Sequence, residues 1–262
     1  MASNGGPIVW GTSEVPVGIF VNGLPGDADL RGRVELATDQ AASGQSSLKF
    51  YMPSRSGAGY AGQFYANFSD DDSVQFGEGE EFYVQWRQRF SPAFVKNYYV
   101  NGSDWKQVIV GEGNRSGHVA GSCTQLELVV NHSEYGYPSM YHSCGGKDDQ
   151  YEGIEQYWFV DYEVDQWMTF QLGVRIGTWY KNDRRYRNDS EIELWVAREG
   201  EPSRRVLSRK YDIANNDERA KYGKVWLLPY LTGKDPSQAH PDAVTWYDEL
   251  IISRAPIADP AH

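Results

Sequence analysis

Cysteine is scarce in this chain of 262 residues, which contains Cys123 and Cys144 alone. Two cysteines are too few for a disulfide scaffold or a structural zinc site, although they suffice for one disulfide bridge. Long apolar runs are also missing: no stretch comes near the roughly 18 residues of a transmembrane helix, so we expect no membrane partner. The chain has no Gly-Lys-Ser/Thr, His-Glu-x-x-His or Gly-x-Ser-x-Gly motif, so nucleotide-hydrolase, zinc-protease and serine-hydrolase chemistry finds no support.

Positive charge is in deficit. The chain carries 25 Lys and Arg against 36 Asp and Glu, a formal net charge of −11. A negative field repels polyanions unless a basic patch overcomes it locally, so we expect no nucleic-acid partner. An acidic polysaccharide is still compatible with this charge if arginines and lysines gather on one face.

Aromatic residues are abundant, with 9 Trp and 18 Tyr beside 27 Gly and 12 Pro. This content excludes a disordered chain. Flat amphipathic rings stack on the apolar faces of sugars while their polar edges bond hydroxyls, so the surplus suits sugar recognition. A β-rich core that simply uses aromatic residues explains the same composition.

Alternation of apolar and polar residues dominates the chain, and helical periodicity is confined to 214–222. Clear alternation predicts strands over 81–90, 124–131, 167–176, 191–197, 224–230 and 246–253, and weaker strands are predicted over 8–10, 34–36, 47–51, 60–64 and 138–143. Many short strands separated by Gly, Pro, Asn and Asp predict an all-β fold, a two-sheet antiparallel β-sandwich with a concave groove. Without repeats or linkers, residues 1–262 are expected to form a single domain.

Strand parity separates a core face from a second face. In 81–90 the apolar set is Phe82, Val84, Trp86 and Phe90, which leaves Tyr83, Gln85, Arg87 and Arg89 on the other side. The same parity leaves Trp167, Gln171 and Arg175 in 167–176, and Glu193 and Trp195 in 191–197. Amide, guanidinium and aromatic side chains together are typical of a glycan-binding surface, although an ordinary solvated face is the alternative.

The two cysteines suggest the register of a hairpin. If Cys123 faces Cys144 across an antiparallel pair, Gln125 lies opposite His142 and Glu127 opposite Met140. Gln125, Glu127 and His142 then share the face away from Leu126 and Leu128. A carboxylate beside His142 suits a general acid or base near neutral pH, whereas a surface histidine without a role is the competing interpretation.

A further strand opens at Trp105, where parity is ambiguous. Lys106 shares the parity of the apolar Val108 and Val110, so either Lys106 or Gln107 is the groove residue. Basic runs at 181–187 and 204–210 could hold an anionic polysaccharide but are more typical of solvated loops. The acidic run 69–73 could hold calcium, although a solvated turn is the simpler interpretation.

Four segments carry a resemblance to a known family. They are 83–92 (YVQWRQRFSP), 105–111 (WKQVIVG), 226–234 (WLLPYLTGK) and 245–253 (TWYDELIIS). These short segments are distributed over most of the length of the chain. With these segments the chain resembles the concanavalin A-like jelly rolls, and among them the polysaccharide lyases of the heparin lyase I and alginate/glucuronan lyase type. The resemblance implies β-elimination on a uronic-acid polysaccharide by a carbon–oxygen lyase.

Such chemistry needs a group that neutralises the uronate carboxylate, a base for the acidified proton and an acid for the leaving oxygen. The residues that the resemblance implies for catalysis are His142 or Tyr230 as base and acid, with Gln125, Arg89 and Lys106 as neutralising groups. The residues expected to bind substrate are Arg87, Tyr83, Gln107, Glu127, Arg175, Trp195 and Lys234.

Two other functions remain open. Glu127 paired with Glu193 at roughly 5–9.5 Å would suit a glycoside hydrolase acting on a neutral glycan. A lectin-like module would instead stack sugars on Trp195, Trp167 and Tyr83 without chemistry. For each of these functions we expect a monomer that needs no cofactor, with a structural calcium ion as the one metal the acidic run could hold. The chain shows no signal peptide, and we expect a secreted or periplasmic protein.

Overall fold

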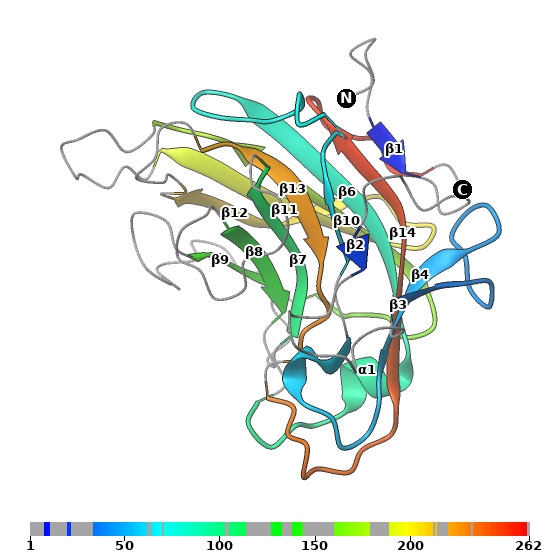
Figure 1. The fold of residues 1–262 in the computed structure, drawn as a ribbon. Coiled ribbons are helices and arrows are strands. Elements are labelled where there is room, and N and C mark those ends of the chain that lie inside the picture. The colour runs from blue at the N-terminus through cyan, green and yellow to red at the C-terminus, as the bar shows by residue number, and fades with distance from the viewer. Residues whose placement is uncertain are drawn as a thin grey trace.

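The structure is a computed structural model. It describes residues 8–10, 20–21, 34–61, 64–69, 71–102, 105–113, 127–132, 138–143, 160–178, 189–211, 213, 220–231 and 233–260. Within these residues almost all regular structure is β, and the strands form two layers (Figure 1).

The larger layer, sheet A, has eight strands in the described part of the chain. Its order is β12-β11-β10-β6-β14-β4-β3, and β1 pairs with β14 beyond the end of β4. Its strands are β1 (Ile8–Trp10), β3 (Val34–Ala37), β4 (Ser47–Met52), β6 (Glu81–Phe90), β10 (Trp167–Arg175), β11 (Ser190–Arg198), β12 (Arg204–Tyr211) and β14 (Ala243–Ser253).

The smaller layer, sheet B, has six described strands in the order β2-β5-β13-β7-β8-β9. They are β2 (Phe20–Val21), β5 (Phe64–Asn67), β7 (Trp105–Glu112), β8 (Glu127–His132), β9 (Pro138–Ser143) and β13 (Tyr222–Leu227). All registers between named strands are antiparallel. The predicted all-β, two-sheet antiparallel sandwich is confirmed.

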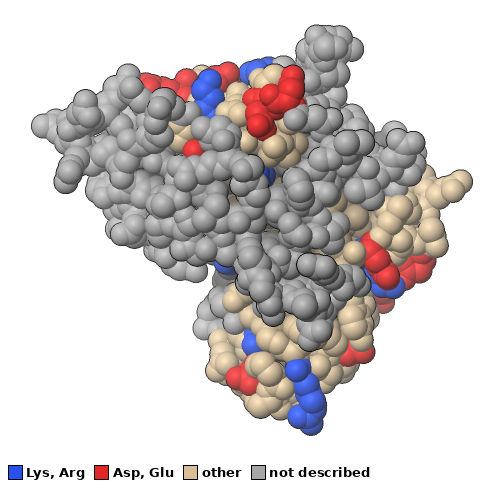
Figure 2. Space-filling view, viewed as in Figure 1, with Lys and Arg blue, Asp and Glu red and all other residues tan. Residues whose placement is uncertain are grey.

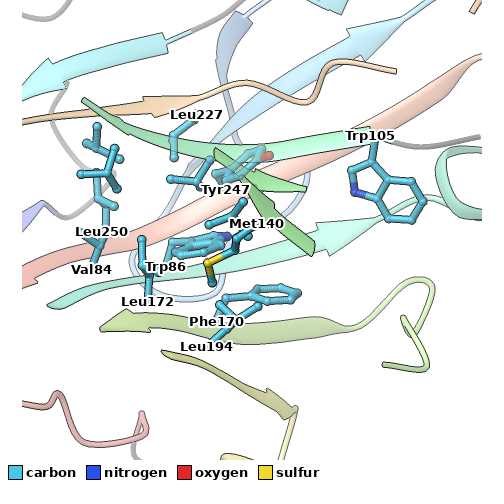
Figure 3. Close-up of a cluster of buried hydrophobic side chains, with 14 of the residues drawn as sticks. Val84, Trp86, Trp105, Met140, Phe170, Leu172, Leu194, Leu227, Tyr247 and Leu250 are labelled. Carbon is cyan, nitrogen blue, oxygen red and sulfur yellow. The ribbon is translucent and has the colours of Figure 1, made fainter. Parts of the chain in front are cut away.

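The hydrophobic core lies between the two sheets. In Figure 3, Trp86 and Phe170 of sheet A point toward Leu227 and Met140 of sheet B. The rings of Trp86 and Phe170 stack with centroids 5.4 Å apart, and both side chains are fully buried. Each large apolar side chain buried in this way contributes about 1.5–3 kcal/mol of transfer free energy. The core parity predicted for 81–90, 167–176 and 191–197 is confirmed.

Several local predictions were wrong. Residues 58–61 form a 3₁₀ turn, η2 (Ala58–Ala61), and the strand predicted at 60–64 begins at Phe64. The basic run 204–210 is not a loop but the edge strand β12, in which Val206 and Leu207 are buried. The helix expected over 214–222 lies mostly outside the described residues, and its last residue, Tyr222, begins strand β13.

The sequence predicted no helix at 92–96, where the structure has α1 (Pro92–Lys96). Ser91 precedes it with extended backbone, and its side chain accepts a hydrogen bond from the Phe94 amide. Proline fits the first turn of a helix, where no amide partner is available within the helix. The Ser-Pro pair was thus a signal for this short helix.

The predicted register of the β8–β9 hairpin was also wrong. Leu128, and not Gln125, lies opposite His142, and Val130 lies opposite Met140. Val130 and Met140 are both buried in the core. A shift by an odd number of residues exchanges the faces of one strand, so burial of this apolar pair decides the register.

Charges on the described surface are mixed. In Figure 2, acidic and basic side chains of the described residues occur in small neighbouring groups on the face shown. No helix in the described part of the chain is long and apolar enough to span a membrane.

Candidate functional site

The outer face of sheet A is covered by the chain's own C-terminal segment. Gln171 binds Ile257 twice, since its side-chain oxygen accepts from the Ile257 amide at 2.7 Å and its nitrogen donates to the Ile257 carbonyl at 3.2 Å. Gln85 donates to the Ala258 carbonyl, and Asp259 accepts from the Ser203 amide. Both glutamines are buried. Their amides therefore hold the chain's own backbone.

The arginines predicted for the site have carboxylate partners on this same face: Arg89 was expected to neutralise the substrate carboxylate, and Arg87 and Arg175 to bind substrate. Arg87 lies 3.4 Å from Glu199 and 3.6 Å from Glu249, and Arg89 lies 3.9 Å from Asp165. The Arg87 guanidinium also lies over the Trp167 ring at 6.0 Å. Arg175, at the end of β10, pairs with Glu191 at 2.5 Å.

Two of the three predicted stacking residues, Tyr83 and Trp195, lie over Gly173. The Tyr83 and Trp195 rings lie 6.5 Å apart, and a Cβ atom on Gly173 would approach them to 2.9 and 3.0 Å. Glycine is required at this position because both rings occupy the space above it. Tyr83 also donates a hydrogen bond to Glu81, and burial with that carboxylate raises the pKa of the Tyr83 phenol.

The outer face of sheet B differs in character. Ile109 and Trp226 face each other there and form a small apolar cluster with Leu228, separate from the main core. Register places Lys106 opposite Asn131, one row away from the pair Ile109 and Val129.

Lys106 and Tyr230 are two predicted site residues that the structure brings together. The Lys106 ammonium lies 5.0 Å from the centroid of the Tyr230 ring, an arrangement favoured by the electron-rich face of the ring. Their backbones are also joined, since the Lys106 amide donates to the Tyr230 carbonyl at 2.9 Å. Both residues are half-buried. A cation and a phenol are thus adjacent at the end of β7.

Gln107 and Lys234 are buried inside the protein. Gln107 is fully buried between the sheets, where its nitrogen donates to Gln88 and its oxygen accepts from Tyr162. The Lys234 ammonium donates to the carbonyls of Pro53 and Ser56 at 2.8 and 2.6 Å. Both were predicted to bind substrate, and neither reaches a sheet face in the structure.

The hairpin residues can be placed by register alone. Glu127 lies opposite Gly111 and Ser143, in one of the outer-face rows of sheet B. His142 lies in the neighbouring row, opposite Leu128. In this register His142 and Lys106 lie in different rows of the sheet. Gln125, Cys123 and Cys144 lie outside the described residues, so the disulfide stays a prediction.

Two residues of the outer face of sheet B were missed. Register assigns Tyr141 to this face, opposite Val129. Lys224 lies opposite Gly111 and alternates with the core residue Val225. Burial lowers the pKa of Lys224, while Asp72 and Glu112 act in the opposite direction. Parity within 224–230 could have identified Lys224, but Tyr141 required the true hairpin register.

The outer face of sheet B therefore combines the half-buried Lys106 beside Tyr230 with a second lysine, Lys224, that is only 4% exposed. Among the residues that the structure describes, no group of three or more His, Cys, Asp or Glu is arranged to hold a metal ion.

No protein-family model matches the chain, and no curated protein matches it in sequence. Solved structures are similar in fold. The PL-14 alginate lyase from Aplysia kurodai has a TM-score of 0.60 and 13% identity, over 87% of each chain. The endo-β-1,4-glucuronan lyase from the fungus Trichoderma reesei has a TM-score of 0.50 and 14% identity, over 84% of this chain and 86% of its own.

A variant of the alginate lyase Aly36B in complex with alginate trisaccharide is also similar. Its TM-score is 0.54 at 12% identity, over 96% of this chain and 99% of its own. At these identities the likeness establishes the fold. The expected resemblance to the jelly-roll polysaccharide lyases is thus confirmed at the level of structure.

Proposed function

We propose that this protein is a polysaccharide lyase that cleaves a uronic-acid polysaccharide by β-elimination on the outer face of sheet B. One observation carries the proposal: the Lys106 ammonium lies 5.0 Å from the Tyr230 ring centroid on that face. The fold shared with alginate and glucuronan lyases supports the same reaction class.

The two side chains match the needs of elimination. The Lys106 ammonium pairs with the C5 carboxylate and stabilises the negative charge that develops when the C5 proton leaves. Tyr230 acts as the base and takes the proton from C5. The C5 electron pair then forms the C4–C5 double bond, and the C4–O4 bond breaks. A proton returned to O4 completes the leaving group, so no water is added and no oxidant is needed.

The two alternative functions lose support. A hydrolase using Glu127 with Glu193 would need both carboxylates on one face, but these residues belong to different sheets, and Glu193 pairs with Arg205. A lectin face built on Trp195, Trp167 and Tyr83 would need exposed rings, whereas Trp167 and Tyr83 are 5% and 7% exposed and Trp195 alone is half-buried.

An anionic substrate is compatible with the net charge of −11 when the binding charge is local. Lys106 supplies positive charge on the outer face of sheet B, while Arg87 and Arg89 of sheet A are paired with carboxylates. A polymer of this kind does not cross membranes, which supports a secreted or periplasmic protein.

The test is incubation with alginate, glucuronan and heparin, one at a time. Elimination leaves an unsaturated sugar, so we expect ultraviolet absorbance to rise with at least one of these polymers. New reducing ends without that absorbance would indicate hydrolysis, and binding without new ends would indicate a lectin. Either result would overturn the proposal.

Two substitutions locate the site. Lys106→Gln and Tyr230→Phe should each lower kcat/KM by about 100-fold or more, because each removes an electrostatic or proton-transfer group. Lys210→Gln, on the edge strand of sheet A, and Tyr98→Phe, on an exposed loop, are the matched controls and should keep full activity. Full activity in Lys106→Gln would remove Lys106 from the mechanism.

A further inference from the structure

The position of Lys106 depends on an irregularity in β7. Under strict alternation, Lys106 would share the core face of Val108 and Val110. The register shows one extra residue: Lys106 lies opposite Asn131, and Val108 lies opposite Val130. Gln107 has no counterpart on β8, which makes it the extra residue of a β-bulge.

Burial shows what the bulge does. Trp105, Gln107 and Val108 are all buried, whereas Lys106 between them is only half-buried and lies beside Tyr230. The bulge lets two consecutive residues, Gln107 and Val108, face the core, so Lys106 turns outward without disturbing the burial of Val108.

The bulge brings polar groups into the core, where they need partners. The Gln107 side chain donates to Gln88 at 3.1 Å and accepts from the Tyr162 hydroxyl at 3.2 Å. The Gln107 carbonyl accepts from the Tyr247 hydroxyl at 2.9 Å and from the Leu228 amide at 3.1 Å.

These partners come from both layers. Gln88 belongs to β6 and donates in turn to Thr245 of β14 at 3.0 Å, so sheet A is connected through the core to the bulge of sheet B. The Leu228 amide lies in the same segment as Tyr230, whose amide donates to the Leu228 carbonyl at 2.8 Å. The same set of bonds therefore fixes the bulge and the segment that carries Tyr230.

We propose that Gln107 is a positioning residue: its buried amide, held by Gln88 and Tyr162, fixes the β-bulge that turns Lys106 onto the outer face of sheet B beside Tyr230. Gln107 is fully buried and acts through Lys106. The proposal rests on the proposed function for its catalytic consequence, but the placement of Lys106 can be measured without any activity.

The first test measures Lys106 directly. The full-length protein is labelled with an amine-reactive acetyl ester, and the labelled peptides are quantified by mass spectrometry with Lys210 as internal reference. In Gln107→Leu, which keeps the volume but removes both side-chain bonds, the Lys106 labelling ratio should change at least threefold. Gln107→Glu, whose neutral carboxyl can donate and accept, should return the ratio toward the wild-type value at acidic pH.

The matched control is Gln171→Leu. Gln171 is also a buried sheet glutamine with two side-chain hydrogen bonds, but it lies in sheet A and binds the C-terminal segment. It should reduce stability without changing the labelling of Lys106. If Gln107→Leu does not fold, Tyr162→Phe removes one bond to the bulge and should change the ratio in the same direction.

The second test is a double-mutant cycle on kcat/KM. Gln107→Leu should cost at least tenfold in the wild-type background and less than twofold in the Lys106→Gln background. An unchanged labelling ratio in Gln107→Leu and Tyr162→Phe, or equal losses in both backgrounds, would overturn the positioning role. A changed labelling ratio in a protein without lyase activity would instead overturn the proposed function and leave the positioning role intact.

Discussion

His132 is a histidine that burial keeps neutral. It is 5% exposed, its ring stacks on Trp105 at 3.6 Å, and Tyr162 meets it edge-on at 4.3 Å. Burial lowers the pKa of His132 to about 3. An unfolded chain protonates this histidine near pH 6.5, so between about pH 6.5 and pH 3 the unfolded state binds more protons than the folded state.

His132 should therefore make the protein less stable as pH falls. The free energy of unfolding should lose up to about 4 kcal/mol from this residue between pH 6.5 and pH 3. His132→Phe keeps the ring stacking and removes the titration, so its stability should depend less steeply on pH in urea titrations. Identical slopes for both proteins from pH 6.5 to pH 4 would contradict the buried neutral histidine.

Lys234 is a second residue whose role differs from its sequence-based prediction. Lys234→Met leaves the carbonyls of Pro53 and Ser56 without their donor and should lower the free energy of unfolding by about 3 kcal/mol. KM should not change, because the ammonium is buried. Lys49→Met is the matched control: its partly exposed ion pair with Asp39 should cost about 1 kcal/mol or less. A raised KM in Lys234→Met at unchanged stability would restore the substrate-binding interpretation.

At the scale of elements, the C-terminal segment stabilises the outer face of sheet A. Removing residues 255–262 deletes the bonds of Gln171 to Ile257 and of Gln85 to Ala258. The free energy of unfolding should fall by about 2–4 kcal/mol, at roughly 1 kcal/mol for each hydrogen bond. Lyase activity of the folded fraction should remain, since Lys106 is in the other sheet.

Removal of residues 260–262 alone is the control for that truncation, because it keeps Asp259 and the segment before it. This shorter truncation should be as stable as the full chain in denaturant. Equal stability of both truncations would show that the segment contributes nothing to sheet A.

Comparison of β6, β10 and β11 with β7 shows which strand faces can be predicted from the sequence. Alternation within β6, β10 and β11 predicted the core faces correctly because each strand has several large apolar residues with one parity. In β7 the bulge at Gln107 breaks that parity, and the partners that stabilise the bulge come from β6, β14 and Tyr162. Such long-range contacts have no local signal, so the sequence left Lys106 and Gln107 unresolved.

At the scale of the whole molecule, the alternation of apolar and polar residues indicates which side of a strand faces the core. It does not indicate to which sheet the strand belongs. Arg87, Arg89 and Trp195 were grouped with Lys106 and Tyr230 as one surface, yet the first three belong to sheet A and Lys106 to sheet B. The two outer faces of a sandwich point in opposite directions. The candidate site therefore contains fewer cations than the sequence suggested.

The net charge of −11 predicts an unusual salt dependence. At about 10 mM salt the screening length is about 30 Å, so the whole acidic molecule repels an anionic chain; at about 150 mM it falls to about 8 Å and mainly local charges act. For a short uronate oligosaccharide, kcat/KM should rise over this range while kcat stays constant. A steady fall of kcat/KM from the lowest salt onward would show that attraction dominates at long range.

The central claim is elimination on the outer face of sheet B. It is tested most directly by letting the protein cleave its polysaccharide substrate in water enriched in ¹⁸O and measuring the product masses by mass spectrometry. Elimination adds no water, so the account predicts that each cut leaves one unsaturated product without enzymatically incorporated ¹⁸O, at a rate that Lys106→Gln lowers and Lys210→Gln does not. One ¹⁸O atom incorporated at each cut, with no unsaturated product, would show hydrolysis and contradict the account.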